Sequence, residues 1–141
     1  LKRKGAENIM TVRSDDGMDE FSTSSTNRVC ILRGNKVLMN AIDPEVVGLH
    51  KSSLKDIQIK TKQDAIESFV GVLNNTASQA MIETTALNAA GGLIVANIAD
   101  NFEQGVEIAL KTIKDGKAIS LLEKFVSETG DITKLKEITN G

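Results

Sequence analysis

Four carboxylates crowd into one short stretch of the chain. Residues 15–20 read Asp-Asp-Gly-Met-Asp-Glu and follow residues 8–12, which have the composition of a strand. Carboxylates this close together repel one another unless cations or basic groups offset their charge. Mg²⁺ commonly binds one or two protein carboxylates together with substrate phosphates and water, and α/β proteins bind ligands where strands end. The stretch predicts either a Mg²⁺ site or, equally well, a solvated acidic turn.

Other kinds of catalytic site have little support. His50 is the only histidine and Cys30 the only cysteine, so the two cannot close a tetrahedral zinc site. His50 has no partner close in sequence and is interpreted as an ordinary loop histidine, and we assign no catalytic residue. The Ser/Thr-rich residues 22–26 are typical either of hydroxyls that hold a phosphate or of a mobile loop.

The composition excludes several classes of function. The 141 residues carry 17 Lys+Arg against 19 Asp+Glu, a net charge of −2, which gives no electrostatic basis for binding nucleic acid or an anionic membrane. Trp and Tyr are absent and only four Phe are present, so the chain lacks platforms for base stacking. A single cysteine excludes a disulfide framework and fits a cytoplasmic setting.

The first half of the chain reads as strands. Residues 27–33 and 36–42 flank Gly34-Asn35, a dipeptide typical of a two-residue hairpin turn. Both faces of this hairpin are apolar, which predicts that it is covered on both sides. Asp43-Pro44 then begins a short helical turn.

From residue 61 the apolar period changes from two to about 3.6, the period of a helix. Thr61 is the expected N-cap of a helix that ends at Asn74-Asn75, and residues 77–97 form an Ala-rich helix expected at the centre of the core. The two later helices have predicted buried faces made of Phe102, Val106, Ala109, Leu110 and Ile113, and of Ala118, Leu121, Leu122 and Phe125. A short segment after Gly130-Asp131 closes the chain.

This inventory predicts an α/β fold with a mixed sheet, in which a β-hairpin is followed by a run of helices. Three strands are a thin sheet for so much helix, so the chain is expected to be an incomplete portion of a larger α/β domain. Residues 1–5 are typical either of the last turn of a helix stopped by Gly5 or of a frayed basic terminus.

The order of motifs resembles the C-terminal part of the anthranilate phosphoribosyltransferase family over nearly the whole chain. The segments that carry the resemblance are Asp16-Gly17-Met18-Asp19-Glu20, Pro44-Glu45 with Gly48-Leu49, Leu87-Asn88-Ala89-Ala90, Gly105-Val106-Glu107, and Ile113 through Asp115-Gly116-Lys117-Ala118. The resemblance implies that residues 1–141 are the C-terminal portion of one α/β catalytic domain. Residues 1–60 would supply the strands, acidic turn and hairpin, and residues 61–141 the helices.

That family joins anthranilate to phosphoribosyl pyrophosphate and releases pyrophosphate, in tryptophan biosynthesis. The resemblance implies that Asp19 and Glu20 help to hold Mg²⁺ on the pyrophosphate, and that the intact enzyme is a homodimer through an N-terminal helical portion. The family's Gly-Thr-Gly-Gly-Asp loop is absent here, so this chain alone is expected to be inactive.

The chain departs from the family pattern just before the acidic turn, and two alternative functions remain open. The family usually has Val-Val-His-Gly before the acidic turn, whereas this chain has Thr11-Val12-Arg13-Ser14. Arg13 either pairs with Asp15 or adds positive charge near phosphates. The alternatives are an enzyme like pyrimidine nucleoside phosphorylase and a non-enzymatic α/β module that binds a divalent cation.

Overall fold

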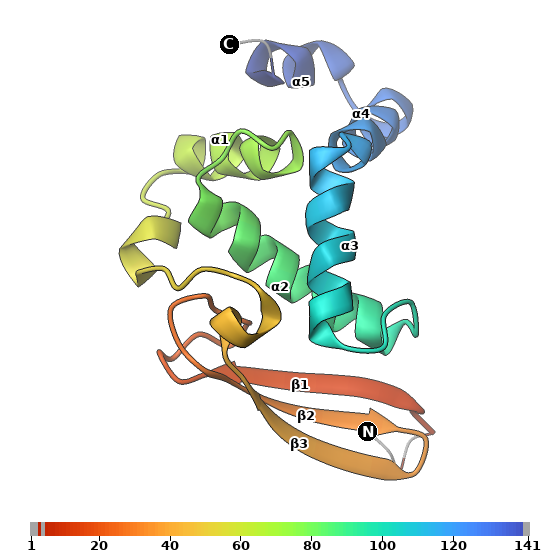
Figure 1. Ribbon diagram of the computed structural model, residues 1–141. Helices are drawn as coiled ribbons and strands as arrows, with labels where there is room; N and C mark the ends of the chain where they lie inside the picture. The colour runs from red at the N-terminus through yellow and green to blue at the C-terminus, as the bar shows by residue number, and fades with distance from the viewer. Residues whose placement is uncertain (1–2, 4, 140–141) are drawn as a thin grey trace.

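Three strands form one sheet in the order β1-β2-β3 (Figure 1). The structure, a computed structural model, describes residue 3 and residues 5–139. The strands are β1 (Asn8–Ser14), β2 (Asn27–Arg33) and β3 (Lys36–Ile42). Arg33 pairs with Lys36 across the turn, which confirms the two-residue hairpin, and Gly34 takes a φ of +53° there.

The α/β class is confirmed, but the mixed sheet is not. Both strand pairings among the described residues are antiparallel. The loop of residues 15–26 joins β1 to β2 without a helix, whereas parallel neighbours need a crossover, which is usually helical. Any parallel partner of β1 would therefore have to come from residues other than those described.

Seven helical segments follow the sheet, in the order expected from the change of period. They are η2 (Pro44–Val47), η3 (Leu54–Ile57), α1 (Lys62–Leu73), α2 (Gln79–Val95), α3 (Phe102–Lys114), α4 (Lys117–Thr129) and α5 (Ile132–Thr139). Thr61 caps α1 as predicted, because its side chain accepts a hydrogen bond from the Asp64 N–H. Asn101 caps α3 in the same way through the Gln104 N–H.

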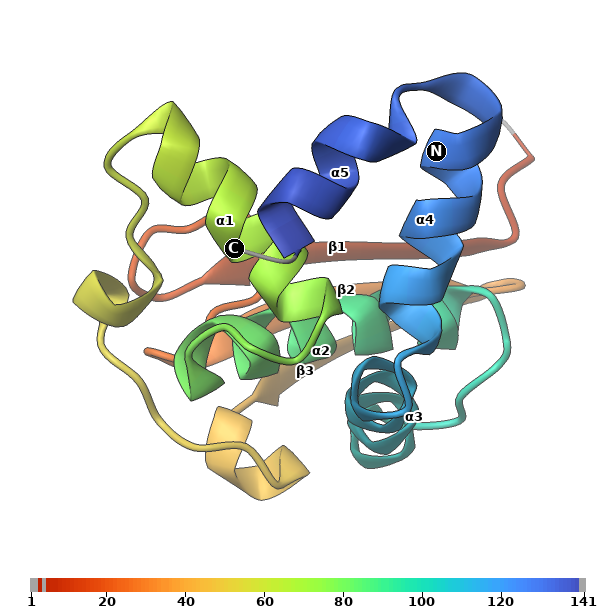
Figure 2. The same cartoon turned by 90° about the horizontal axis from the view of Figure 1, so that it is seen from above.

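The core lies between one face of the sheet and α2, with α3 packed beside α2 (Figures 1 and 2). Ala86, Leu87 and Ala90 of α2 are completely buried, which confirms the central place predicted for this helix. The other buried apolar residues of the core are Phe21, Val29, Ile31, Val47, Leu49, Ile94, Ala99, Phe102 and Val106. This core fixes α2 against the end of β1, where the acidic turn begins.

Two surfaces that were expected to be buried are exposed. All described helices lie on one face of the sheet (Figures 1 and 2), and Met39 on the other face is 82% exposed. On α4, Leu121 and Phe125 are 69% and 62% exposed. The described residues leave these sides largely uncovered, because periodicity shows that a side is apolar, not that a partner within the chain covers it.

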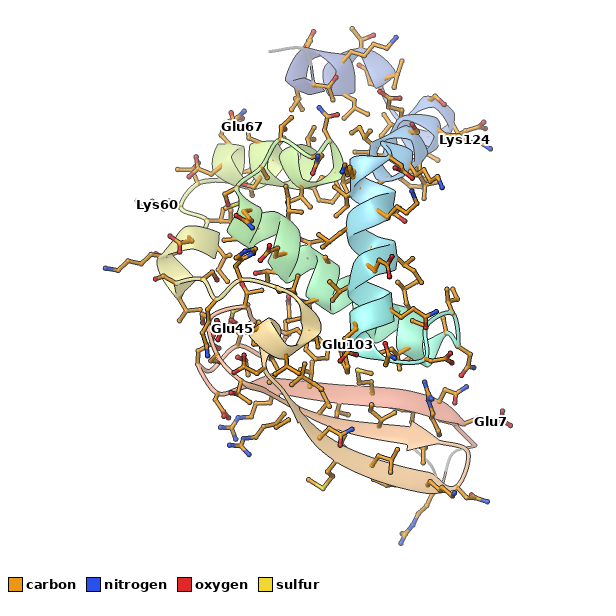
Figure 3. All side chains as sticks on the ribbon, viewed as in Figure 1. Glu7, Glu45, Lys60, Glu67, Glu103 and Lys124 are labelled. Atoms are coloured by element: carbon orange, nitrogen blue, oxygen red, sulfur yellow. The ribbon has the colours of Figure 1, made fainter. Side chains whose placement is uncertain are left out.

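The helix end suggested for residues 1–5 lies largely outside the described residues, although Gly5 has the left-handed φ of +82° expected of a helix stop. Charged side chains such as Lys60, Glu67 and Lys124 point outward from the body of the molecule (Figure 3). Among the described helices, none is long and apolar enough to span a bilayer.

Candidate functional site: the acidic turn

The acidic turn is a tight loop closed by its own backbone. The Ser14 N–H donates to the Met18 carbonyl at 2.9 Å, and the Met18 N–H donates to Asp16 Oδ1 at 3.1 Å. Gly17 between them has a φ of +99°, which residues with a Cβ rarely adopt. The Asp-Gly dipeptide therefore reverses the chain immediately after β1, as expected from its type.

Two of the four carboxylates are used inside the protein. Arg28 donates to Asp15 through Nε at 2.8 Å and Nη2 at 3.1 Å, and this bond lowers the pKa of Asp15. Asp16 accepts from the Ser24 hydroxyl as well as from Met18. Burial works to raise the pKa of Asp16, but bonds from serine hydroxyls and the Met18 N–H outweigh it and hold this pKa below its usual range.

Arg28, rather than Arg13, is therefore the partner of Asp15. Arg13 lies on β1, whereas Arg28 lies on β2, and Arg13 lowers the pKa of Asp15 only through its charge. The two arginines face each other in the register of β1 and β2, which the spacing along the chain does not reveal. The serine hydroxyls of the loop serve Asp16 in this structure, and their predicted role toward phosphate stays a prediction.

The other two carboxylates, Asp19 and Glu20, have no partner among the residues that the structure describes. Both are exposed, and neither makes a hydrogen bond or ion pair with a described residue. Both border a cavity of about 440 Å³ that is also lined by Met10, Asn88 and Gly91. Glu20 borders in addition an apolar cavity of about 340 Å³ beside α1. The turn thus presents two exposed carboxylates to the cavity of about 440 Å³.

His50 lies away from the acidic turn and takes part in a different contact. Its Nδ1 is 2.8 Å from Glu83 Oε1, and its backbone N–H donates to Glu83 Oε2 at 2.8 Å. The interpretation of His50 as a loop histidine stands, with the addition that it anchors its loop to α2. Among the residues that the structure describes, no three His, Cys, Asp or Glu side chains form a group that could hold a metal ion.

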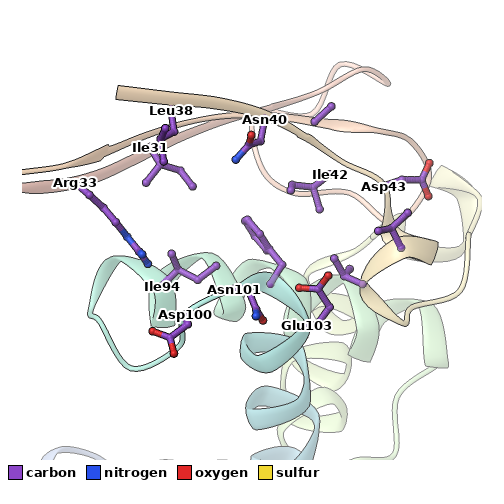
Figure 4. A pocket seen from close by; sticks show the side chains of 14 residues that line it. Ile31, Arg33, Leu38, Asn40, Ile42, Asp43, Ile94, Asp100, Asn101 and Glu103 are labelled. Atoms are coloured by element: carbon purple, nitrogen blue, oxygen red, sulfur yellow. The ribbon is translucent and has the colours of Figure 1, made fainter. Parts of the chain in front are cut away.

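A further cavity of about 360 Å³ lies between β3, η2 and the start of α3 (Figure 4). Ile31 and Ile42 line it from the sheet and Ile94 from α2, and Arg33 and Glu103 also border it (Figure 4). Neither Asp19 nor Glu20 lines it. It is therefore separate from the acidic turn.

Two asparagines beside the turn were not expected to matter for the site. Asn27 and Asn88 bind the backbone of the residues that follow Glu20. In the sequence, Asn88 stands within a family-like motif and Asn27 at the start of a predicted strand, and neither position indicates these contacts. The available signal is the amide of Asn88 within the Ala-rich second half of α2, because a half-buried amide needs partners.

Comparison with known proteins places the chain among glycosyl transferases. Residues 1–119 match the family described as "Glycosyl transferase family, a/b domain". The chain is 86% identical over all of its 141 residues to anthranilate phosphoribosyltransferase of Nitrosopumilus maritimus, covering 40% of that protein. It is 47% identical over 97% of its length to the enzyme of the same name from Cenarchaeum symbiosum, again covering 40%. The chain thus spans about two fifths of the length of these relatives.

Solved structures agree in fold. Anthranilate phosphoribosyltransferase from Thermus thermophilus superposes with a TM-score of 0.79 at 26% identity, over 89% of this chain and 36% of that one. The enzyme from Saccharomyces cerevisiae, solved in complex with PRPP and Mg, has a TM-score of 0.71 at 21% identity, over 85% of this chain and 33% of that one. The yeast comparison supports the fold alone.

Proposed function

Because the chain belongs to the glycosyl transferase family, we propose that it serves the transfer of the phosphoribosyl group from phosphoribosyl pyrophosphate to anthranilate, with release of pyrophosphate. The observation that carries the proposal is the exposed pair Asp19 and Glu20, unengaged within the described chain. The pair stands in a chain 86% identical to an anthranilate phosphoribosyltransferase. The activity belongs to the protein as a whole, since the chain spans 40% of that relative.

Asp19 and Glu20 are the residues that would hold Mg²⁺. Carboxylate oxygens are hard ligands, and Mg²⁺ usually keeps one or two of them together with substrate phosphates and water. A pair of carboxylates without a third ligand among the described residues fits that pattern. The pairing of Asp15 with Arg28 and the bonds to Asp16 reduce the repulsion that four free carboxylates would suffer.

Bound Mg²⁺ would stabilise the negative charge that develops on pyrophosphate as its bond to the ribose carbon breaks. Asp19 and Glu20 would contribute by holding the metal ion in a fixed place beside the pyrophosphate. No proton transfer is needed for a pyrophosphate that leaves in this way, so the acidic turn can act without His50. That histidine is occupied with Glu83.

We also infer the setting of this activity. Residues 1–141 would be the C-terminal portion of one α/β catalytic domain in a homodimeric, cytoplasmic enzyme of tryptophan biosynthesis, with the dimer contacts outside these residues. The support is the order of the motifs along the chain and the names of its relatives.

The proposal is tested by neutralising the pair in the protein expressed from its complete gene. We expect Asp19→Asn with Glu20→Gln to lower kcat/KM by about 100-fold or more, because metal binding supplies several kcal/mol of charge stabilisation. Consumption of anthranilate with phosphoribosyl pyrophosphate and Mg²⁺ can be followed by its fluorescence.

Asp15→Asn is the matched control, since it removes a carboxylate of the same turn that is engaged by Arg28. We expect this variant to keep most of the activity. Near-normal turnover of the double variant would overturn the metal assignment. Phosphate-dependent cleavage of nucleosides without transfer to anthranilate would favour a nucleoside phosphorylase instead.

A further inference from the structure

Asp19 and Glu20 form a short span between two firmly held residues. On one side, both backbone groups of Met18 are bonded, its N–H to Asp16 and its carbonyl to the Ser14 N–H. On the other side, both backbone groups of Phe21 are bonded to a single side chain of α2, that of Asn88. The two carboxylates make no bonds of their own among the described residues, so these flanking anchors set their position.

The side chain of Asn88 bonds both the N–H and the carbonyl of Phe21, as the backbone of a neighbouring strand would. The Phe21 N–H donates to Asn88 Oδ1 at 3.1 Å, and Asn88 Nδ2 donates to the Phe21 carbonyl at 2.8 Å. Nδ2 also donates to the Thr84 carbonyl at 2.9 Å, one turn earlier in α2. This set of partners needs one acceptor and two donors on the same side chain, and among neutral side chains of this length only an amide provides them.

The side chain of Phe21 is held as firmly as its backbone. Phe21 is buried, and its ring packs edge-on against Phe102 with 5.2 Å between the ring centroids. Its ring also lies over Gly91, where a Cβ would come within 2.8 Å of Phe21 Cε2. The residue next to Glu20 is thus fixed both by an amide and by close packing on α2.

We propose that Asn88 is a positioning residue of the reaction: its amide clamps Phe21 so that Asp19 and Glu20 face the cavity at a fixed spacing. The inference rests on the proposed function, in which these carboxylates hold Mg²⁺. Asn88 itself borders the same cavity of about 440 Å³ as the two carboxylates. Residues that orient metal ligands typically change metal affinity by about 10–100-fold when they are replaced.

Asn27 holds the next residue but has a broader structural task. It is fully buried and exchanges two hydrogen bonds with the backbone of Ser22, at 2.7 and 2.9 Å. It also donates to the Ile42 carbonyl of β3 at 3.3 Å. Its replacement would disturb the sheet as well as the loop, so Asn88 is the better probe of positioning.

The test measures metal binding directly as well as activity, in the protein expressed from its complete gene. Mn²⁺ alone replaces Mg²⁺, and the free ion is quantified by electron paramagnetic resonance. We expect Asn88→Ala to weaken Mn²⁺ binding about tenfold and to raise the Mg²⁺ concentration for half-maximal activity by a similar factor. Hydrogen exchange of the Phe21 amide should become faster.

The controls separate positioning from general loss of stability. Asp131→Ala removes the hydrogen bond that Asp131 accepts from the Thr133 N–H at the start of α5, which lies at the opposite end of the molecule from the sheet (Figure 1). It should lower the melting temperature without changing Mn²⁺ affinity. Asn88→Ser keeps a hydroxyl that can bond the Thr84 carbonyl but is too short to clamp Phe21, and should act like Asn88→Ala. It provides the test if Asn88→Ala does not fold.

Each outcome bears on one proposal. Unchanged Mn²⁺ affinity in a folded Asn88 variant would overturn the clamp, as would an equal loss in Asp131→Ala. If Asp19→Asn with Glu20→Gln leaves Mn²⁺ binding unchanged, the metal assignment itself is wrong. Loss of binding in that double variant alone would keep the assignment and reject the role of Asn88.

Discussion

Glu83 is a charged side chain that the fold buries. It lies on α2 with 6% of its surface exposed, and its carboxylate accepts hydrogen bonds from the His50 backbone, the His50 ring and Gln79. Burial works to raise the pKa of Glu83, but these bonds outweigh it and lower the pKa below its ordinary value of 4.5. A single residue thus ties the loop after η2 to the central helix.

This geometry predicts how stability depends on pH. Because the pKa of Glu83 is lower in the folded state, its contribution is complete above about pH 4.5 and is lost as the pH falls through the folded pKa. Glu83→Gln should therefore lower the free energy of unfolding by about 1.5–3 kcal/mol at pH 7, measured with urea, and by less at pH 3.5. Glu107→Gln, an exposed change on α3, should have little effect at either pH. An equal cost of Glu83→Gln at both pH values would contradict the argument.

At the scale of elements, α2 and α3 approach each other through small residues. A Cβ placed on Gly105 of α3 would come within 2.8 Å of Ala90 Cβ and 2.9 Å of Ala90 Cα. The second of these atoms belongs to the backbone of α2, so no side-chain rotation can relieve the contact. The close approach brings Phe102 of α3 against Phe21, beside the acidic turn.

Adding one methyl group at this crossing should therefore be costly. We expect Gly105→Ala to destabilise the protein by about 1–3 kcal/mol through overpacking. Gly92→Ala is the matched control on α2, because a Cβ there meets no atom within 4 Å. It should stabilise the helix by up to about 1 kcal/mol. Thermal unfolding of both variants would check this. Unchanged stability of the Gly105→Ala variant would show that the helices can separate without cost.

The helices, strands and turns could largely be predicted from the sequence, whereas the contacts between them could not. Caps such as Thr61, the Gly34-Asn35 turn and the change of apolar period define the elements, because these signals are local. The pairing of Arg28 with Asp15 and the clamp of Asn88 on Phe21 depend on strand register and on residues 67 positions apart. Local patterns carry no information about such contacts. The resemblance of motifs predicts Asp19 and Glu20 as metal ligands, but it does not predict what holds them in place.

At the scale of the molecule, the main feature is a sheet whose described helices all lie on one face (Figures 1 and 2). β3 is exposed along most of its length, with Val37, Leu38 and Met39 all at least half exposed. It is also an edge strand, so its outer backbone groups are available to another strand. The net charge of −2 provides little repulsion between copies. Together these properties favour self-association of the 141-residue chain when it is expressed by itself.

A single charge on the bare face should reduce that association. Met39 is 82% exposed and lies opposite Cys30 in the register of β2 and β3. Met39→Lys is expected to lower the apparent mass of the chain in concentration-dependent light scattering, with little change in its unfolding temperature, because lysine on an edge strand opposes pairing between copies. Met39→Leu keeps the apolar surface and should associate like the original chain. If both variants associate equally, the contact between copies must use another surface. The exposed side of α4 around Leu121 and Phe125 is then the next surface to test.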